Sequence, residues 1–568
     1  MISAPITALA GTSFFSVLDW GVIVVYLVLM IAIGAWAARG QSGNRDYFLG
    51  GRNLPWWAVG CSIIATETSA LTFIGIPAMA IGTVLVTPLP DGSPHPYSYI
   101  LQGGHMYFMM LVVGYVTGRL AVIKWVIPRY FTGEIYTTYE LINHAFGERS
   151  RMAVAALSVV QIILGAGVRI YVTAIPIALL LVSLGVPGGG IPLSILVILI
   201  GSLLYTAFGG IKAVVYTDMV QYFIFVGAAL LAAFYIPYLI GSRSGEGFGG
   251  GVAVIAEHAT NGGPWNIWNS GFSPLDNATV VDHLKNILSG PENIIAGLIP
   301  MTFGILLAFG FDQLNVQRVL ACKDVREGRK AMLFSAVMIV PQFFLFLLIG
   351  VELFGFYNWN GFNYNGLAPV DPAWFPANPG ELPKGKGDFI FPIFIFTEMP
   401  SLMKGLLVAA ILSAAMSSVS SALSALGSMA IVDFYKPWKG GAVSSSKEEL
   451  FLSRIAILLS GAALGIVAFY SSLYPKDLIS LAFTLTNIPG GPILGAFLFA
   501  FYKGKGDWRP LVFGIMVGFI LMALMSFFLI PNKLMWPIHW SWHAFIGGLC
   551  TFSAAWVADQ FFRKFPAN

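Results

Sequence analysis

Residues 412–428 read LSAAMSSVSSALSALGS and place hydroxyl groups in an otherwise apolar run. On a helix most of these serines share one stripe, formed by Ser413, Ser417, Ser420, Ser424 and Ser428, with Ser418 and Ser421 beside it. Small residues let helices pack closely, and a serine hydroxyl can bond to the carbonyl four residues earlier. Hydroxyls and free carbonyls are also neutral hard ligands that suit Na⁺. The adjacent serine pairs favour a sodium site over helix packing alone.

A carboxylate stands within a second apolar run, GGIKAVVYTDMVQYFIFV (209–226), as Asp218. A carboxylate at membrane depth is costly and indicates a functional site. The alternative is a carboxylate at a helix entry that faces cytoplasmic water. His539 and His543 have metal-ligand spacing, but the tryptophans around them favour anchoring at the membrane interface. The sequence contains no Walker-type phosphate loop, catalytic triad or zinc signature, which disfavours an ATP-driven pump and an enzyme.

The composition indicates a membrane protein, so these groups must be positioned by membrane-spanning helices. Of 568 residues, 57% are hydrophobic and only 10% are charged, whereas about a quarter of an ordinary soluble domain is charged. Long apolar runs recur, each near the ~20 residues that cross the hydrocarbon, so we predict an all-α polytopic protein with about 13 transmembrane helices. The predicted spans are 16–38, 55–82, 101–125, 153–184, 191–209, 213–240, 291–311, 331–355, 402–432, 452–473, 477–502, 509–530 and 540–562.

The distribution of Lys and Arg predicts the orientation. With the N-terminus outside and the C-terminus inside, most basic residues fall in cytoplasmic loops, including the clusters Arg119–Arg151 and Arg318–Lys330. Arg169 is the one basic residue left in the middle of a span. Two outer loops are long, 241–290 and 356–401, and the second is predicted to form an ordered cap or a mobile lid.

Two predicted spans carry interruptions in comparable places. In the second span, IIATETSALTF breaks the apolar run at Thr66–Ser69, and in the seventh span Pro300 and Gly304 fall inside the helix. Irregular backbone is tolerated at membrane depth only where it lines a cavity. A pair of broken helices in corresponding halves is typical of an inverted-repeat secondary transporter.

The motif GGIKAVVYTDMVQ around Asp218 resembles the signature of the sodium:solute symporter family, whose members carry sugars, proline, iodide, monocarboxylates or sialic acids. Four further stretches resemble the same family in the family's order. They are DYFLGGRNLPWWAVGCSIIATETSALTFIG (46–75), TGEIYTTYELINHAFGERSR (132–151), FDQLNVQRVLACKD (311–324) and AAMSSVSSALSALGSMAIVDFY (414–435). The resemblance covers most of the chain from about residue 17 to about residue 530, and the predicted span count agrees with bacterial members of the family.

The resemblance implies one transporter domain over residues 1–568 with a leucine-transporter-type core of two inverted five-helix repeats. Residues 16–38 would be an extra N-terminal helix, 55–240 the first repeat, 291–502 the second repeat and 509–562 two C-terminal helices. The implied activity is sodium-coupled import of a small organic solute by alternating access.

The resemblance also implies sodium ligands. The first site would use the main-chain carbonyls of Ala65, Thr68 and Ala414 with the hydroxyls of Ser417 and Ser418. A possible second site would use Asp218, Ser417, Ser420 and Ser421. All the required side chains are present, so one or two sodium ions are expected per cycle.

For the solute, the resemblance implies a site beside the break of the second span. The candidates are Glu67, Ser69, Thr72, Phe73, Gln102, Arg169, Phe303, Phe309 and Asn487. A guanidinium suits a carboxylate, so Arg169 favours an organic anion such as sialic acid. Glu67 favours a sugar, polyol or zwitterion if it pairs with Arg169, and a buried ion pair without solute contact is a third reading. Phe303 and Phe309 either stack on a sugar ring or only pack between helices.

The expected setting is the plasma membrane, as in a multi-pass protein of the bacterial inner membrane. We expect a functional monomer in the lipid bilayer whose partners are sodium ions and a small solute, with no nucleic acid. A membrane sensor is the alternative from another class. The tail DQFFRKFPAN is too short for a signalling domain, which disfavours that reading.

Overall fold

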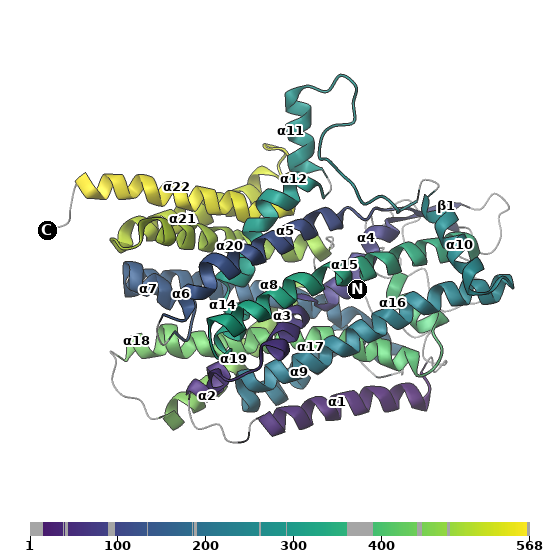
Figure 1. Ribbon diagram of the computed structural model, residues 1–568, viewed down its shortest axis with the longest axis horizontal. Helices are drawn as coiled ribbons and strands as arrows, with labels where there is room; N and C mark the ends of the chain where they lie inside the picture. Colours follow the sequence, from purple (N-terminus) through teal and green to yellow (C-terminus); the bar gives the residue numbers. More distant parts are fainter. Residues whose placement is uncertain are drawn as a thin grey trace.

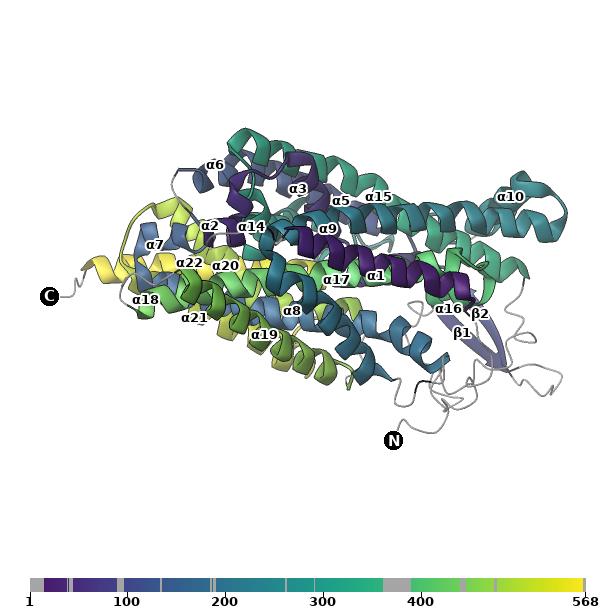
Figure 2. The same ribbon diagram turned by 90° about the horizontal axis from the view of Figure 1, so that it is seen from below.

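The computed structural model describes residues 15–37, 39, 44–88, 97–132, 135–183, 186, 190–260, 263–290, 292–360, 390–439, 446–473 and 478–564. Within these ranges the protein is a bundle of long helices that run along its longest axis (Figures 1 and 2). The first half contains α1 (Val17–Ala37), α2 (Asn44–Leu49), α3 (Trp56–Glu67), α4 (Ala70–Ile81), α5 (Phe108–Ala121), α6 (Ile127–Tyr130), α7 (Glu140–Phe146), α8 (Glu148–Ser183) and α9 (Ile191–Ser244).

The second half begins with two helices that fall in the predicted loop 241–290. Its helices are α10 (Gly247–Thr260), α11 (Val280–Ser289), α12 (Ile294–Ala296), α13 (Thr302–Gly310), α14 (Gln313–Leu320), α15 (Val325–Asn360), α16 (Ile390–Glu398), α17 (Met403–Met429), α18 (Lys436–Trp438), α19 (Ser446–Ser471), α20 (Leu478–Lys503), α21 (Trp508–Leu524) and α22 (His543–Lys564). Of the loop 356–401, residues 361–389 lie outside the described part, so the predicted cap or lid is not described.

Each predicted span overlaps a helix or a bent helix pair of the structure. Among the described residues, 9 helices are long and apolar enough to cross a membrane, or up to 11 if each bent pair counts as one span. The bent pairs are Trp56–Glu67 with Thr72–Ile81, at 56°, and Val280–Ser289 with Ile294–Gly310, at 61°. The first bend falls at the interruption predicted in the second span. The total of 13 spans and the orientation stay predictions.

The predicted boundary between the fifth and sixth spans lies inside α9, at Gly210. Its φ of 56° and ψ of −160° interrupt the helix, and an added Cβ would stand 2.5 Å from the Tyr47 carbonyl oxygen. Only glycine meets both demands without strain. The kink redirects the chain just before the segment that carries Asp218.

A β-hairpin interrupts the predicted all-α pattern between α4 and α5. Strand β1 (Thr83–Pro88) pairs antiparallel with β2 (Tyr97–Gln102), with Thr83 opposite Gln102 and Pro88 opposite Tyr97. The prediction of a span beginning at residue 101 was therefore wrong at its start, because the helix begins at Phe108. The strands read TVLVTP and YSYILQ, and such β-branched and aromatic residues favour extended chain.

Helix α17 lies at the centre of the bundle and carries the serine stripe. It packs against α1, α3, α4, α8, α9 and α19, and every residue from Leu407 to Met429 is buried. By contrast, α1 lies along one edge of the bundle, while α21 and α22 lie along the opposite edge in Figure 1. The serines therefore face protein and not lipid, as an ion site requires.

Candidate functional site

The break between α3 and α4 frees backbone carbonyls in the middle of the bundle. Thr68 ends α3 with a φ of −81° and a ψ of 84°, and Ser69 is extended. The Ser69 amide donates to the Glu67 carbonyl and not to that of Ala65. Likewise the Thr72 amide donates to the Ser69 carbonyl and not to that of Thr68. The two carbonyls predicted as sodium ligands have thus lost their usual helical donors.

Ser418 connects this break to α17. Its Oγ lies 3.4 Å from the Thr66 carbonyl oxygen and 3.3 Å from the Ala414 carbonyl oxygen. The structure therefore places the α17 serines beside the broken span. Some hydroxyls of the stripe do bond back to their own helix: Ser413 donates to Ala409 at 2.7 Å, and Ser420 donates to Ser417 at 3.0 Å. Helix packing and ion binding are therefore not exclusive readings of this stripe.

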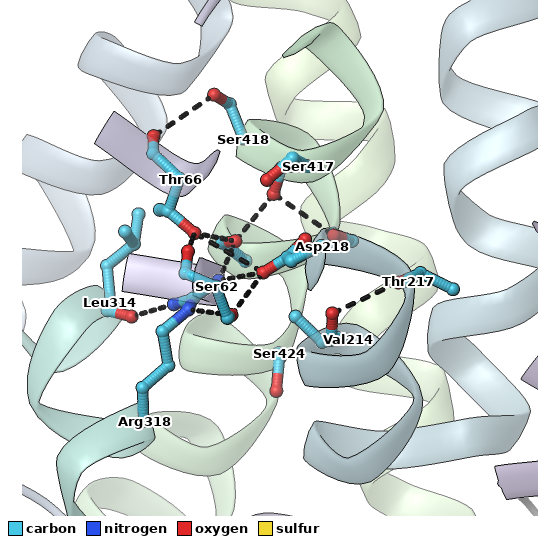
Figure 3. Close-up of polar contacts among 12 residues, drawn as sticks. Ser62, Thr66, Val214, Thr217, Asp218, Leu314, Arg318, Ser417, Ser418 and Ser424 are labelled. Atoms are coloured by element: carbon cyan, nitrogen blue, oxygen red, sulfur yellow. Dashed lines mark hydrogen bonds and ion pairs between the residues drawn. The ribbon is translucent and has the colours of Figure 1, made fainter. Parts of the chain in front are cut away.

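Asp218 lies in a fully buried polar cluster with residues of α3, α14 and α17 (Figure 3). Its Oδ2 accepts from Ser62 Oγ at 2.6 Å and pairs with Arg318 Nη2 at 2.9 Å. The same Arg318 nitrogen donates to Ser421 Oγ. Asp218 is therefore not a helix-entry group facing water. Of the residues predicted to bind sodium, Asp218 and Ser421 contact the Arg318 guanidinium, and Ser417 accepts a hydrogen bond from Ser421.

A cavity of about 150 Å³ lies beside the break and is walled by α3, α4, α5, α8, α13, α14, α15, α20 and the turn before α22. Six of the nine predicted solute residues line it: Glu67, Ser69, Thr72, Arg169, Phe309 and Asn487. Asn487 also donates from Nδ2 to the Trp540 carbonyl, at 3.2 Å. The cavity therefore brings together most of the groups that the sequence predicted around the solute.

Two of the remaining predicted solute residues, Phe73 and Phe303, lie elsewhere. Phe73 is fully buried between Phe346 and Phe391, and Phe303 packs against Phe545 with ring centroids 5.1 Å apart. The family resemblance made both solute candidates, but each points into a helix interface, which for Phe303 is the packing alternative given above. The backbone of Gln102 belongs to β2, and its side chain lies outside the described residues.

Glu67 pairs with an arginine other than Arg169. Glu67 forms an ion pair with Arg119 of α5, whose guanidinium carbon lies 4.0 Å from the centre of the Phe309 ring. Arg169 also lines the cavity, and within the described residues its guanidinium has no ion pair or hydrogen bond. The structure thus pairs Glu67 with Arg119 and not with Arg169, so the reading in which Glu67 pairs with Arg169 is wrong.

Arg119 and Arg318 correct the sequence interpretation, which assigned both to cytoplasmic basic clusters. Their side chains are 0% and 1% exposed. The signal that could have found them is the presence of two unpaired carboxylates, Glu67 and Asp218, in apolar spans, since buried carboxylates need cationic partners. Further cavity residues that the sequence did not single out are Tyr115, Gln161, Asp312, Asn315, Phe483, Thr486 and Trp540.

The turn before α22 closes one side of the cavity. Trp540 stacks on Phe483 with ring centroids 4.2 Å apart, and the amide of His539 donates to the Leu288 carbonyl at 2.8 Å. His539 Nδ1 lies 2.9 Å from Ser541 Oγ. Burial, with smaller contributions from neighbouring histidines, lowers the pKa of His539 to about 4. At neutral pH this imidazole is uncharged and acts as a packed polar group.

Acid is expected to loosen this turn through His539. Its unfolded pKa is about 6.5, so the native state binds fewer protons, and the stability that it contributes above pH 6.5 is lost as the pH falls toward 4. Between pH 7.5 and pH 5 the free energy of unfolding of His539→Gln should fall by about 2 kcal/mol less than that of the wild type. Thermal unfolding at both pH values measures this, with His144→Gln, at an exposed position, as the control. Equal acid losses in all three proteins would contradict it.

Comparison with known proteins shows which family has this architecture. A model of the sodium:solute symporter family matches residues 47–87 and 97–518. The sodium/sialic acid symporter SiaT of Proteus mirabilis (strain HI4320) is 27% identical over 513 residues, which are 89% of this chain and 89% of that protein. The sodium/glucose cotransporter of Vibrio parahaemolyticus is 27% identical over 450 residues, or 75% of this chain and 70% of that protein.

A solved structure described as the substrate-bound outward-open state of a Na⁺-coupled sialic acid symporter shares the fold. It superposes with a TM-score of 0.74 at 22% identity, over 97% of this chain and 99% of that one. This likeness confirms the predicted leucine-transporter-type fold, and the family match covers most of the chain. The chain therefore belongs to the sodium:solute symporter family, as a sodium-coupled solute transporter with multiple spans in the plasma membrane and not an enzyme.

Proposed function

We propose that this transporter imports a small organic anion of the sialic acid kind together with sodium. The observation that carries the proposal is Arg169, whose guanidinium lines the cavity and makes no hydrogen bond or direct ion pair in the described part of the chain. Such a group binds a carboxylate through paired, charge-assisted hydrogen bonds. The hydroxyls of Ser69 and Thr72 line the same cavity and suit the hydroxyls of a sugar acid. Relatives that carry sialic acid support this choice.

Two features support a sodium site at the junction of α3, α4 and α17. The carbonyls of Ala65 and Thr68 lack their usual helical donors, and Ser417 and Ser418 stand on the helix that faces them. With Ala414, these residues would hold the first ion. Asp218, Ser417, Ser420 and Ser421 would hold a second ion. Each ion that enters gains ~2.3 kcal/mol per 100 mV of membrane potential, so the ion count sets the driving force on the solute.

Alternating access follows from where the ion would bind. Sodium between the broken span and α17 would hold the two together, because its ligands come from both. Its release inward would let α3 and α17 separate and open the cavity to the other side. Coupling of this kind is reciprocal. If sodium raises the affinity for the solute by some factor, the solute must raise the affinity for sodium by the same factor. We propose that 55–240 and 291–502 are the repeats that move, and that the monomer in the bilayer suffices.

A zwitterion is the second candidate solute, and Asp312 is the observation that favours it. This carboxylate lines the cavity that contains Arg169, and it interacts with Arg169 through space without a direct ion pair. Its Oδ1 accepts from the Leu314 amide at 3.0 Å, which fixes the side chain at the start of α14. A solute with a carboxylate and an ammonium group could bridge Arg169 and Asp312.

Thermal unfolding of the purified protein separates these candidates. A solute that binds only the native state raises the melting temperature by mass action. Unfolding should be measured in Na⁺ and in K⁺ with sialic acids, sugars, monocarboxylates and amino acids. We expect a sialic acid to stabilise the protein in Na⁺ but not in K⁺. Stabilisation by amino acids alone would favour the zwitterion, and no stabilisation by Na⁺, with or without solute, would overturn the sodium-coupled proposal for these residues.

A further inference from the structure

The guanidinium of Arg318 lies among the oxygens predicted for the second sodium ion. Its Nη2 pairs with Asp218 Oδ2 at 2.9 Å and donates to Ser421 Oγ. Ser421 Oγ in turn donates to the Ser417 carbonyl at 2.5 Å. Figure 3 shows Arg318 reaching from α14 into the space between α3, α9 and α17. A positive charge of the protein itself thus stands where a cation is expected.

The cluster also has oxygens with unused capacity. Asp218 Oδ1 and Ser417 Oγ are buried and make no hydrogen bond of good geometry within the described residues, although the Ser417 hydroxyl interacts with the Asp218 carboxylate. Asp218 and Ser417 are each 0% exposed, so bulk water does not satisfy them. Buried polar atoms are normally well hydrogen-bonded, and in this cluster the two that are not both belong to the predicted ligand set. A cation could therefore gain ligands here that the guanidinium does not use.

The remaining bonds of Arg318 lie outside this ligand set. Nε donates to Ser62 Oγ at 2.8 Å, and Nη1 donates to the Leu314 carbonyl. Only the two Nη2 contacts, to Asp218 and Ser421, involve predicted sodium ligands. Because a guanidinium is planar and rigid, Nη2 can leave these oxygens only when the whole head group of Arg318 turns away, so an exchange with a small ion requires a change of the Arg318 rotamer.

We propose that Arg318 is a tethered cation that competes with the second sodium ion for Asp218 and Ser421. The inference rests on the proposed sodium ligands. With either cation alone the buried cluster is neutral, whereas both together leave an excess positive charge that burial disfavours. The ion binds when the Arg318 head group turns away from Asp218 and Ser421, and Arg318 returns when the ion leaves. The carrier can then change sides without sodium and without exposing Asp218 as an uncompensated buried carboxylate.

Replacing Arg318 with Gln tests the competition, and Arg318→Lys, which keeps the charge, is the matched control. Thermal unfolding should be followed against Na⁺ concentration in K⁺-balanced buffer without solute, so that transport is not required. For Arg318→Gln we expect half-maximal stabilisation at a Na⁺ concentration at least tenfold lower than for the wild type, and a protein that is much less stable in K⁺ than in Na⁺. The Lys variant should keep a sodium dependence near that of the wild type.

Two results would overturn the inference. One is a sodium dependence of Arg318→Gln that is unchanged or weaker than that of the wild type. The other is loss of the folded state in both Na⁺ and K⁺, because then sodium cannot take the place of the guanidinium. A second measurement uses Arg318→Ala and free guanidinium ion at millimolar concentration. The ion should stabilise this variant in K⁺, and added Na⁺ should displace it; no effect of guanidinium contradicts the proposal.

The response of the wild type to Na⁺ distinguishes a failure of this inference from a failure of the proposed sodium sites. If wild-type protein and all Arg318 variants ignore Na⁺, the predicted sodium sites themselves are wrong. If the wild type responds to Na⁺ and Arg318→Gln responds identically, the sites stand and only the competition is wrong. The double variant Asp218→Asn with Arg318→Gln removes both charges, and it should fold while losing the extra sodium response of Arg318→Gln.

Discussion

Arg169→Ala is expected to abolish stabilisation by an anionic solute while leaving stabilisation by sodium near that of the wild type. Arg169 is the cavity cation without a partner among the described residues, so it alone offers a guanidinium to a carboxylate. Loss of a charge-assisted pair costs about 3 kcal/mol, which is about a hundredfold in solute affinity. Thermal unfolding against solute concentration in saturating Na⁺ measures this change.

Two further variants sharpen the Arg169 prediction. Arg169→Lys keeps the charge but loses the planar fork, so its solute affinity should fall between those of Ala and the wild type. Phe303→Leu is the matched control, because Phe303 packs against Phe545 outside the cavity. An unchanged solute response in Arg169→Ala would contradict the anion assignment. A loss of the same size in Phe303→Leu would show that the Arg169 effect is not specific to the cavity.

The sequence predicted the helical fold well because its signals are local. Apolar runs near the length of a span identify helices one at a time, and the polar interruption around Thr66–Ser69 lies where the second span bends by 56°. The same locality explains the missed hairpin. The segments 83–88 and 97–102 lie between two apolar helices, so 83–88 and 97–100 were assigned to the connection between the spans, and residues 101 and 102 were read as the start of the next helix. Alternation over six residues is a weak signal beside a long apolar run.

The site was predicted less completely, because pairing between distant segments leaves no local trace. The sequence offered Arg169 as a possible partner of Glu67, because Arg169 is the one basic residue in the middle of a predicted span. Arg119 stands at the end of a span and Arg318 in a short helix, and counting both as loop residues hid them as partners. The serine stripe, by contrast, was located from spacing alone, since a helix fixes which serines share a face. What sequence spacing could not give is which helix faces that stripe.

Ser418→Ala is expected to weaken sodium binding about tenfold to a hundredfold, which is about 1.5–3 kcal/mol for a hydroxyl that faces a cation. Ser418 is the α17 side chain whose Oγ approaches the Thr66 carbonyl in the broken span, at 3.4 Å. Its removal should therefore weaken the link between the two elements that sodium would hold together. Reciprocity requires that solute affinity at fixed sodium falls as well. Thermal unfolding against Na⁺ concentration, with and without solute, measures both effects.

Ser413→Ala is the matched control for Ser418→Ala, because Ser413 lies on the same buried stripe. Its Oγ donates to the Ala409 carbonyl of its own helix, at 2.7 Å, about one turn before the predicted sodium ligands. Both substitutions remove one buried hydroxyl from α17, so a general effect on helix packing should appear equally in the two variants. Sodium affinity that falls in Ser418→Ala alone assigns the effect to the junction with the broken span. Equal losses of sodium affinity in both variants would mean that the serine stripe serves helix packing only. The first sodium site would then have to lie elsewhere.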